Sequence, residues 1–221
     1  MYYTFHIDDS GAIEDIDERM VNGKDIPICK MYDDPEFNKL NDILHSMNDY
    51  ILNRRALDII AKSNTIEHVL RNAKVLRKEK VLGFFSKWNS YEYFELSFPD
   101  ISAAKCYDWI DFGKSDIVAF DESGQTQKIK SHQHNMELIE ENKSDSNSSY
   151  SFESKKIVFG RNFDSTIDLF RIPHYSWGAY ISERLKVKLE EAKICDVGFA
   201  ETKEELGKVW KPYFPIIEFM E

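Results

Sequence analysis

The pattern of hydrophobic and polar positions between Thr166 and Ala200 predicts one connected structural unit. In Ile167–Ile172 apolar and polar side chains alternate, which is typical of a strand. The next residues, Pro173–Gly178, favour a turn, and Ala179–Ile181 can return antiparallel as a short hairpin partner. This part of the stretch therefore predicts two short strands joined by a turn.

The spacing of apolar residues becomes helical after Ser182. The hydroxyl of Ser182 can accept hydrogen bonds from the free amides of a first helical turn, and Glu183 suits the positive end of the helix dipole. One apolar stripe at helical spacing follows, formed by Leu185, Leu189 and Ala192. Residues 194–200 read as another strand. The whole stretch predicts strand, turn, strand, helix and strand, a unit that needs a sheet to lie on.

The first 50 residues show a strand pattern and a helix pattern. Met1–Ile7 alternates like a strand. Asp33-Asp34-Pro35 is a good helix start, because an acid can cap the helix and proline at the first helical position loses no hydrogen bond. We expect that helix to continue through Asn48 with a buried face made of Phe37, Leu40, Ile43, Leu44 and Met47.

A second strand-to-helix corner resembles the one at Ser182. Tyr50–Leu52 is a short apolar run, Asn53 can act as a cap, and Arg54–Lys62 is helical in pattern. When Asn53 is aligned with Ser182, Arg55 falls on Arg184. The match is short, and it predicts two similar corners within one architecture.

The middle of the chain is mostly strand in pattern. Thr65–Phe85 fits a helix at its start and a strand at its end, whereas Tyr91–Phe98 is a clear strand. Ile117–Phe120 and Lys128–Ile139 suggest a hairpin, and a polar, serine-rich mobile loop is expected at about 140–151. These elements predict an α+β fold with a mixed, mainly antiparallel sheet and a few packed helices.

The length of 221 residues suits one large or two small domains, and we expect a single domain that covers residues 1–221. The chain is 42% hydrophobic and 14% aromatic, which is enough for a real core. Its three cysteines lie far apart without a CxxC pair, so we expect reduced thiols. No signal peptide or membrane-spanning segment is recognisable, and we expect a cytoplasmic protein without a membrane partner. The sequence does not indicate an oligomeric state.

The net charge of −10 favours a basic protein partner over a nucleic acid. Six acidic residues crowd between Asp8 and Glu18, either as a solvated loop or as an acidic docking surface. One basic run points the other way and could suggest nucleic acid; it consists of Arg71, Lys74, Arg77, Lys78 and Lys80. Since no base-stacking motif accompanies that run, we expect no nucleic-acid partner.

Catalytic and metal-binding patterns are weak in this sequence. His132-Gln133-His134 would place two imidazoles on one side of a strand, where a metal could use them, but no third ligand is recognisable. Asp100 with Glu153-Ser154-Lys155 imitates a nuclease site, yet two other Glu-x-Lys runs match equally well. We therefore expect no catalytic residue, no metal site and no cofactor.

Several short motifs resemble a family of bacterial immunity proteins from polymorphic toxin systems, first catalogued as a domain of unknown function. They are Leu169–Ile172, Ile181–Lys186, the pair Gly198-Phe199, and Asp108 with Ser115. The resemblance is best over about residues 105–200. The single predicted domain thus divides into a weakly matched part, 1–104, and a better matched part, 105–221. At the first corner Asn53 stands where the family usually carries serine.

The resemblance implies a protein that acts by binding. Such a protein associates stoichiometrically with a cognate toxin domain, often a nuclease, and blocks its active site or keeps it from its substrate. An acidic surface can meet the basic groove of a nuclease. We expect the partner-binding residues to include Asp15, Asp17, Glu18, Tyr175 and Trp177, although Trp177 fits packing within the hairpin equally well.

Two other functions stay open at this point. One is a metal-dependent hydrolase that uses His132 and His134, and the other is a scaffold or regulatory protein without a toxin partner.

Overall fold

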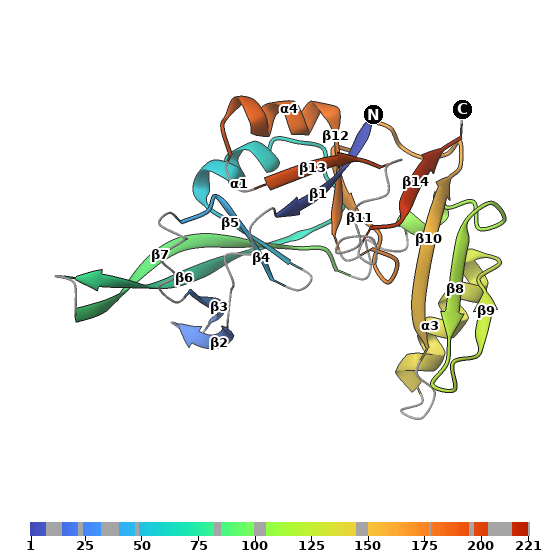
Figure 1. The fold of residues 1–221 in the computed structure, drawn as a ribbon, viewed down its shortest axis with the longest axis horizontal. Helices are drawn as coiled ribbons and strands as arrows, with labels where there is room; N and C mark the ends of the chain where they lie inside the picture. The colour runs from blue at the N-terminus through green and yellow to red at the C-terminus, as the bar shows by residue number, and fades with distance from the viewer. Residues whose placement is uncertain are drawn as a thin grey trace.

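The computed structural model describes residues 1–7, 15–21, 24–31, 40–46, 49–81, 85–99, 105–144, 150–176, 178–194, 197–202 and 214–220. They form three sheets of four, four and six strands with helices packed against them (Figure 1). Most strand pairs are antiparallel. The expected α+β class is therefore confirmed. No helix in the described part of the chain is long and apolar enough to cross a membrane.

The first sheet places the N-terminal strand between strands of the C-terminal half. Its strands, in spatial order, are β11 (Leu169–Arg171), β12 (Ala179–Ser182), β1 (Tyr2–Ile7) and β13 (Val197–Glu201). All three pairings are antiparallel. Helix α4 (Glu183–Glu191) follows β12 directly. The predicted order of strand, turn, strand, helix and strand is confirmed.

The second sheet lies at the other side of the molecule (Figure 1). Its strands, in spatial order, are β14 (Ile216–Phe219), β10 (Ser151–Phe159), β8 (Asp116–Phe120) and β9 (Thr126–Lys128). Helix α3 (His132–Ser144) comes next in sequence after β9. The C-terminal strand β14 runs parallel to β10.

The third sheet is built around one long hairpin. Its strands, in spatial order, are β2 (Asp15–Val21), β3 (Lys24–Met31), β6 (Val69–Val81), β7 (Phe85–Ser97), β5 (Asp49–Leu52) and β4 (Ile43–Ser46). Strands β6 and β7 pair along their full length of 13 residues each. The stretch 65–85, which fitted both helix and strand, is thus mainly strand. Helix α1 (Arg54–Ile60) follows β5.

One hydrophobic core contains residues from all three sheets and from α1, α3 and α4. Phe163 joins the first two sheets, because its ring centroid lies 4.8 Å from that of Phe159 and 5.6 Å from that of Phe170. Tyr50 joins the third sheet to the first. Its hydroxyl accepts from the backbone N–H of Ala179 at 2.8 Å and donates to the carbonyl of Phe5.

The helix expected over residues 35–48 is wrong where the structure describes the chain, because Ile43–Ser46 forms strand β4. Ile43 packs in the main core, whereas Leu44, together with Leu40, packs in a smaller cluster on the opposite side of the third sheet. Since both faces of β4 are covered, its apolar residues are consecutive and imitate helical spacing. Phe37 and Met47 lie outside the described residues.

The hairpin expected from Ile117–Phe120 and Lys128–Ile139 is right only as far as Lys128. Strands β8 and β9 pair as an antiparallel hairpin, but helix α3 begins at His132. Ser131 caps this helix, since its hydroxyl accepts from the backbone N–H of His134 at 3.1 Å. The loop expected at about 140–151 overlaps the end of α3 and the start of β10, and residues 145–149 lie outside the described residues.

Gly178 allows the C-terminal segment to pack against the start of β12. A Cβ atom at this position would lie 2.1 Å from Cζ of Phe214. We expect Gly178→Ala to lower the free energy of unfolding by about 1–3 kcal/mol through overpacking. Urea unfolding of the wild type and the variant measures this loss.

Two further variants test the cause. Gly113→Ala is the control, because its Cβ would meet only a carboxylate oxygen of Asp111 at 3.3 Å. Combined with Phe214→Ala, Gly178→Ala should cost much less than it does alone, since the clash is gone. If the two costs simply add, the clash is not the reason for the loss.

Candidate functional site

The second strand-to-helix corner is held by a network of Asp168, Ser182 and Arg184. Ser182 caps α4, because its Oγ accepts from the backbone N–H of Leu185 at 3.2 Å. The same Oγ donates to Oδ1 of Asp168 at 2.5 Å, and Nε of Arg184 donates to that oxygen at 3.0 Å. One buried carboxylate therefore fixes both the cap and the arginine two residues beyond it.

The first corner has the same arrangement, built from Asp42, Asn53 and Arg55. Asn53 caps α1 by accepting from the backbone N–H of Ala56 at 2.9 Å. Its Nδ2 donates to Asp42 at 2.5 Å, and Arg55 donates to the other oxygen of the same carboxylate. The prediction of two similar corners is confirmed, and the parallel extends to a carboxylate that the sequence alignment did not identify.

The two corners also bind each other. The backbone N–H of Asn64 donates to Oδ2 of Asp168 at 3.0 Å, and the guanidinium of Arg55 donates to the carbonyl of Lys193 at 2.9 Å. Asn64 follows its cap by 11 residues, as does Lys193. Each corner thus contacts the segment that follows the other corner's helix, and α1 and α4 lie side by side (Figure 1).

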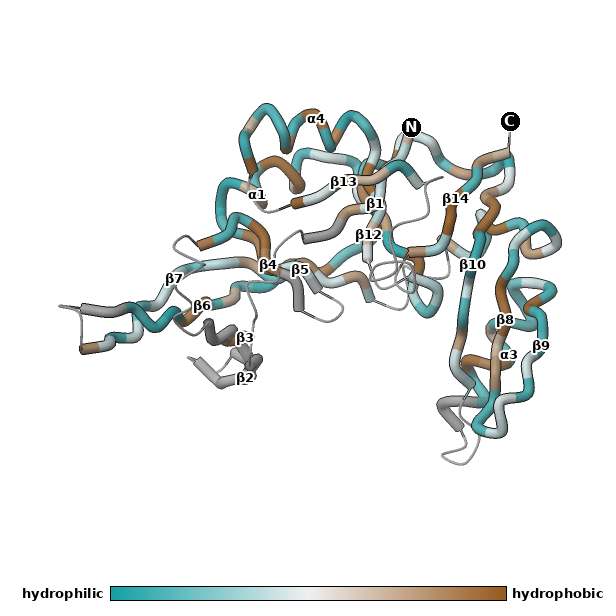
Figure 2. Tube along the Cα trace, in the orientation of Figure 1, coloured by the Kyte–Doolittle hydropathy of each residue, from teal (hydrophilic) through white to brown (hydrophobic). Residues whose placement is uncertain are grey.

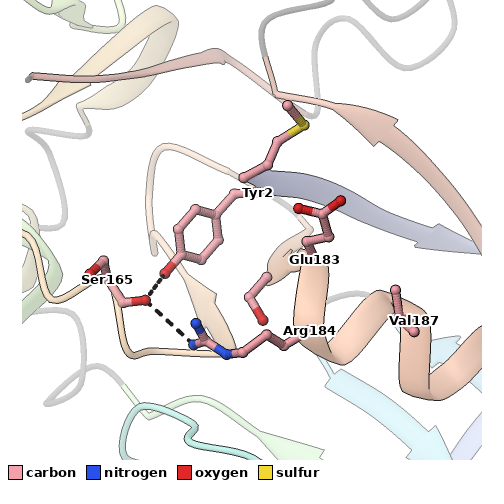
Figure 3. A pocket seen from close by; sticks show the side chains of 7 residues that line it. Tyr2, Ser165, Glu183, Arg184 and Val187 are labelled. Carbon is pink, nitrogen blue, oxygen red and sulfur yellow. Dashed lines mark hydrogen bonds between the residues drawn. The ribbon is translucent and has the colours of Figure 1, made fainter.

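A cavity of about 560 Å³ opens beside the second corner (Figure 3). It is lined by Met1, Tyr2, Ser165, Ser182, Glu183, Arg184 and Val187. The hydroxyl of Tyr2 donates to the carbonyls of Ser165 at 3.1 Å and Ile167 at 2.8 Å. Arg184 also donates to the carbonyls of Ser165 and Thr166. The hydroxyl of Tyr2 and the guanidinium of Arg184 therefore hold the loop that precedes β11.

The electrostatics of the cavity fit a structural role. Burial by itself would raise the pKa of Asp168, but hydrogen bonds from Ser182 and Asn64 and the charge of Arg184 outweigh it and hold the pKa below its usual range. Burial raises the pKa of Tyr2 to about 12. At neutral pH the carboxylate is charged and the phenol is neutral, which is the state that their hydrogen bonds require.

Asp108 and Ser115, the motif of the family resemblance that precedes β8, are also structural. Ser115 is buried, donates to the carbonyl of Asp111 at 2.8 Å and accepts from the backbone N–H of Val158 at 2.9 Å. Asp108 accepts from the side chain of His132, and its carbonyl accepts from Asn162. These contacts tie the segment before β8 to β10 and α3.

His132 and His134 do not lie on one side of a strand, and that prediction is wrong. Both belong to the first turn of α3, where two positions correspond to about 200° around the helix axis. Nδ1 of His132 lies 2.9 Å from a carboxylate oxygen of Asp108. Among the described residues, no group of three or more histidine, cysteine or acidic side chains is placed to hold a metal ion.

Cys106 is a free, buried thiol in the segment before β8. Burial raises its pKa to about 12, and its sulfur donates to the carbonyl of Arg171 at 3.1 Å. The thiol is therefore protonated at neutral pH and serves the packing of β11. Cys29 belongs to β3, and Cys195 lies outside the described residues.

Tyr175 lies inside the turn between β11 and β12. Its side chain is 4% exposed, packs edge to face with Tyr107 at 5.6 Å between ring centroids, and donates to Oδ1 of Asn135 in α3. This position leaves little of the ring for a partner to touch. Trp177 lies outside the described residues.

The acidic candidates Asp15, Asp17 and Glu18 fall on strand β2, at one edge of the third sheet. The sheet order places only β3 between β2 and the basic strand β6. In Cα register, Asp15 pairs with Lys30, and Lys30 pairs with Leu76 of β6. The sequence showed an acidic segment and a basic run, and the fold brings the two into one sheet.

Large apolar side chains are exposed on the β6–β7 hairpin. Phe85 is 63% exposed and Trp88 is 41% exposed, and Leu70 at the base of the hairpin is 41% exposed. Residues 74–92 hold five basic and two acidic residues, a net charge of +3, so the rest of the chain carries −13. Sequence reasoning identified the basic residues of this segment but not the aromatic ones beside them.

Comparison with known proteins does not indicate a function for this chain. Neither a family model nor a curated protein matches this chain.

The corner network yields a prediction about acid stability. Because the pKa of Asp168 is lower in the folded than in the unfolded chain, its carboxylate stabilises the fold above about pH 4 and loses this effect as the pH falls through the folded-state pKa. We expect Asp168→Asn to cost about 1–3 kcal/mol of unfolding free energy at pH 7, with a smaller difference from wild type near pH 3. Urea unfolding at several pH values measures both.

Asp58→Asn is the matched control, because Asp58 is an exposed acid on α1. It should change the unfolding free energy by less than about 0.5 kcal/mol. An equal loss from Asp168→Asn at pH 7 and pH 3 would mean that the charge of the carboxylate does not stabilise the corner.

Proposed function

We propose that this chain is an immunity protein that neutralises a cognate bacterial toxin domain in the cytoplasm by stoichiometric binding. The observation that carries the proposal is that the residues that hold the fold and most of the exposed apolar residues lie in different parts of the molecule. Residues of the family resemblance, among them Ser182 and Ser115, are engaged in holding the fold. Most of the large apolar side chains that are exposed among the described residues lie elsewhere, on the β6–β7 hairpin. A rigid frame with an exposed apolar and charged surface suits a protein that binds another protein.

The charge distribution supports a protein partner. With −13 outside residues 74–92, most of the chain attracts basic surfaces, such as the groove with which a nuclease binds phosphates. Such long-range attraction raises the association rate more than the final affinity. This fits an inhibitor that must reach its toxin before the toxin reaches a substrate.

The test uses the protein encoded next to this chain's own gene, which under the proposal contains the toxin domain. We expect the two purified proteins to form a one-to-one complex in calorimetric titration, and the toxic activity to fall linearly until one equivalent has been added. Cells that express both proteins should survive. No complex at micromolar concentrations would contradict the proposal, as would catalytic destruction of the toxin by substoichiometric amounts of the chain.

The acidic strand yields a second prediction. Charge reversal by Asp15→Lys, Asp17→Lys and Glu18→Lys together should lower the association rate constant about 10-fold at low salt, and the difference from wild type should shrink as salt is added. Stopped-flow fluorescence at several ionic strengths measures both.

A matched variant separates local contact from net charge. Asp116→Lys, Glu122→Lys and Glu153→Lys make the same charge change at exposed positions on two strands of the second sheet and in its β8–β9 turn. If both triple variants slow association equally, only the total charge matters and β2 is not part of the interface.

A further inference from the structure

The outer part of the β6–β7 hairpin extends beyond the strands that flank it. Strand β3 pairs with β6 only as far as Arg77, and β5 pairs with β7 only from Phe94 onward. Among the described residues, no other strand pairs with 78–81 of β6 or with 85–88 of β7, which we name the ribbon tip. Figure 1 shows the hairpin reaching past the rest of the third sheet, away from the second sheet.

Cross-strand contacts keep the hairpin ordered just behind and within the ribbon tip. Glu79 accepts from the hydroxyl of Tyr91 at 2.6 Å and from the side-chain amide of Asn89. These hydrogen bonds, with Arg77 and Lys87 nearby, hold the pKa of Glu79 below its usual range. Because alternate residues of a strand face opposite sides, Lys78 and Trp88, which pair in Cα register, lie on the other face.

The ribbon tip combines the features of a protein-binding hot spot. Trp88 is 41% exposed and Phe85 is 63% exposed. Two-stranded ribbons are only marginally stable in water, and large apolar side chains that stay in contact with water add nothing to their stability. Tryptophan is among the residue types most enriched in interface hot spots, and a polar, solvent-accessible rim surrounds such hot spots. Figure 2 shows hydrophobic and hydrophilic residues interspersed along the hairpin. The charged residues of the ribbon tip are Lys78, Glu79, Lys80 and Lys87.

We propose that the ribbon tip is the surface that docks on the toxin domain, with Trp88 entering an apolar pocket that carboxylates surround. This inference rests on the proposed function and adds a definite partner chemistry. Charge complementarity carries it: the ribbon tip has three lysines and one glutamate, so the opposing surface must be acidic.

A protein surface fits this ribbon tip better than a nucleic acid does. The remainder of the chain carries −13, and acidic β2 lies in the same sheet, so a continuous phosphate backbone would be repelled beside the ribbon. A protein can instead offer an acidic pocket to the ribbon and a basic area to β2.

The first experiment replaces the aromatic anchor. Trp88→Ala should raise the dissociation constant for the catalytically inactive toxin domain by about 30-fold or more, and Trp88→Phe should retain most of the affinity. Leu70→Ala is the matched control, because Leu70 is also 41% exposed but lies about 26 Å along β6 from the partner position of Trp88. Circular dichroism and thermal unfolding verify that each variant is folded.

The second experiment asks whether reversing the charge of two lysines in the ribbon tip weakens or strengthens binding to the toxin domain. Lys78→Glu with Lys87→Glu should weaken binding by about 10-fold or more if the ribbon tip faces carboxylates. If the ribbon tip is outside the interface and the toxin domain is basic, the same variant should bind more tightly through long-range attraction. Lys128→Glu with Lys155→Glu makes an equal charge change on the second sheet and is the control.

The outcomes distinguish the inference from the function on which it rests. If the wild type binds the toxin domain and the ribbon-tip variants bind equally well or better, the ribbon-tip inference fails while the proposed function stands. If the folded wild type does not bind, both fail. Binding of labelled random-sequence DNA or RNA that Trp88→Ala abolishes would overturn the protein-docking inference in favour of a nucleic-acid site.

Discussion

The structure depends on one arrangement that occurs twice, a buried carboxylate that fixes the cap of a helix. A strand that turns directly into a helix brings amides without partners into the protein interior. Ser182 and Asn53 satisfy one such amide each, and Asp168 and Asp42 hold these caps in place. The arginines contribute less through charge, because the side chain of Arg184 is 57% exposed and water screens its attraction.

This arrangement also sets how the two halves of the chain meet. Asn64, after α1, binds the carboxylate of the second corner, and Lys193, after α4, accepts from the arginine of the first. Neither corner is complete without the other half of the chain. Contacts that join residues more than 100 positions apart carry a high loop-closure cost, so these contacts are expected to slow folding more than local contacts do.

The sequence predicted those features of the two corners that depend on residues close together in the chain. Ser182 and Asn53 were recognisable because a cap and its helix are adjacent in sequence. Asp42 and Asp168 were not recognisable as their partners, since they reach the caps only through tertiary structure. Strand β4 was misread because Ile43 and Leu44 are buried on opposite faces, and α3 was misread because Ser131 was not recognised as its cap. The exposed Trp88 could not be predicted, since its exposure depends on where β3 and β5 end.

The third sheet combines charges of opposite sign at short range, and this limits what can bind there. In Cα register, Asp15 of β2 is level with Lys30 of β3 and Leu76 of β6. Strands β2 and β6 are therefore two strand spacings apart, or about 10 Å. This distance is close to the Debye length at physiological salt. The acidic and basic strands therefore partly cancel each other where they run together. Among the described residues, no acidic strand runs beside β6 past Arg77. A ligand of uniform charge meets attraction and repulsion within one footprint, whereas a folded protein with patches of both signs can match both strands, and the same two patches fix the direction in which it docks.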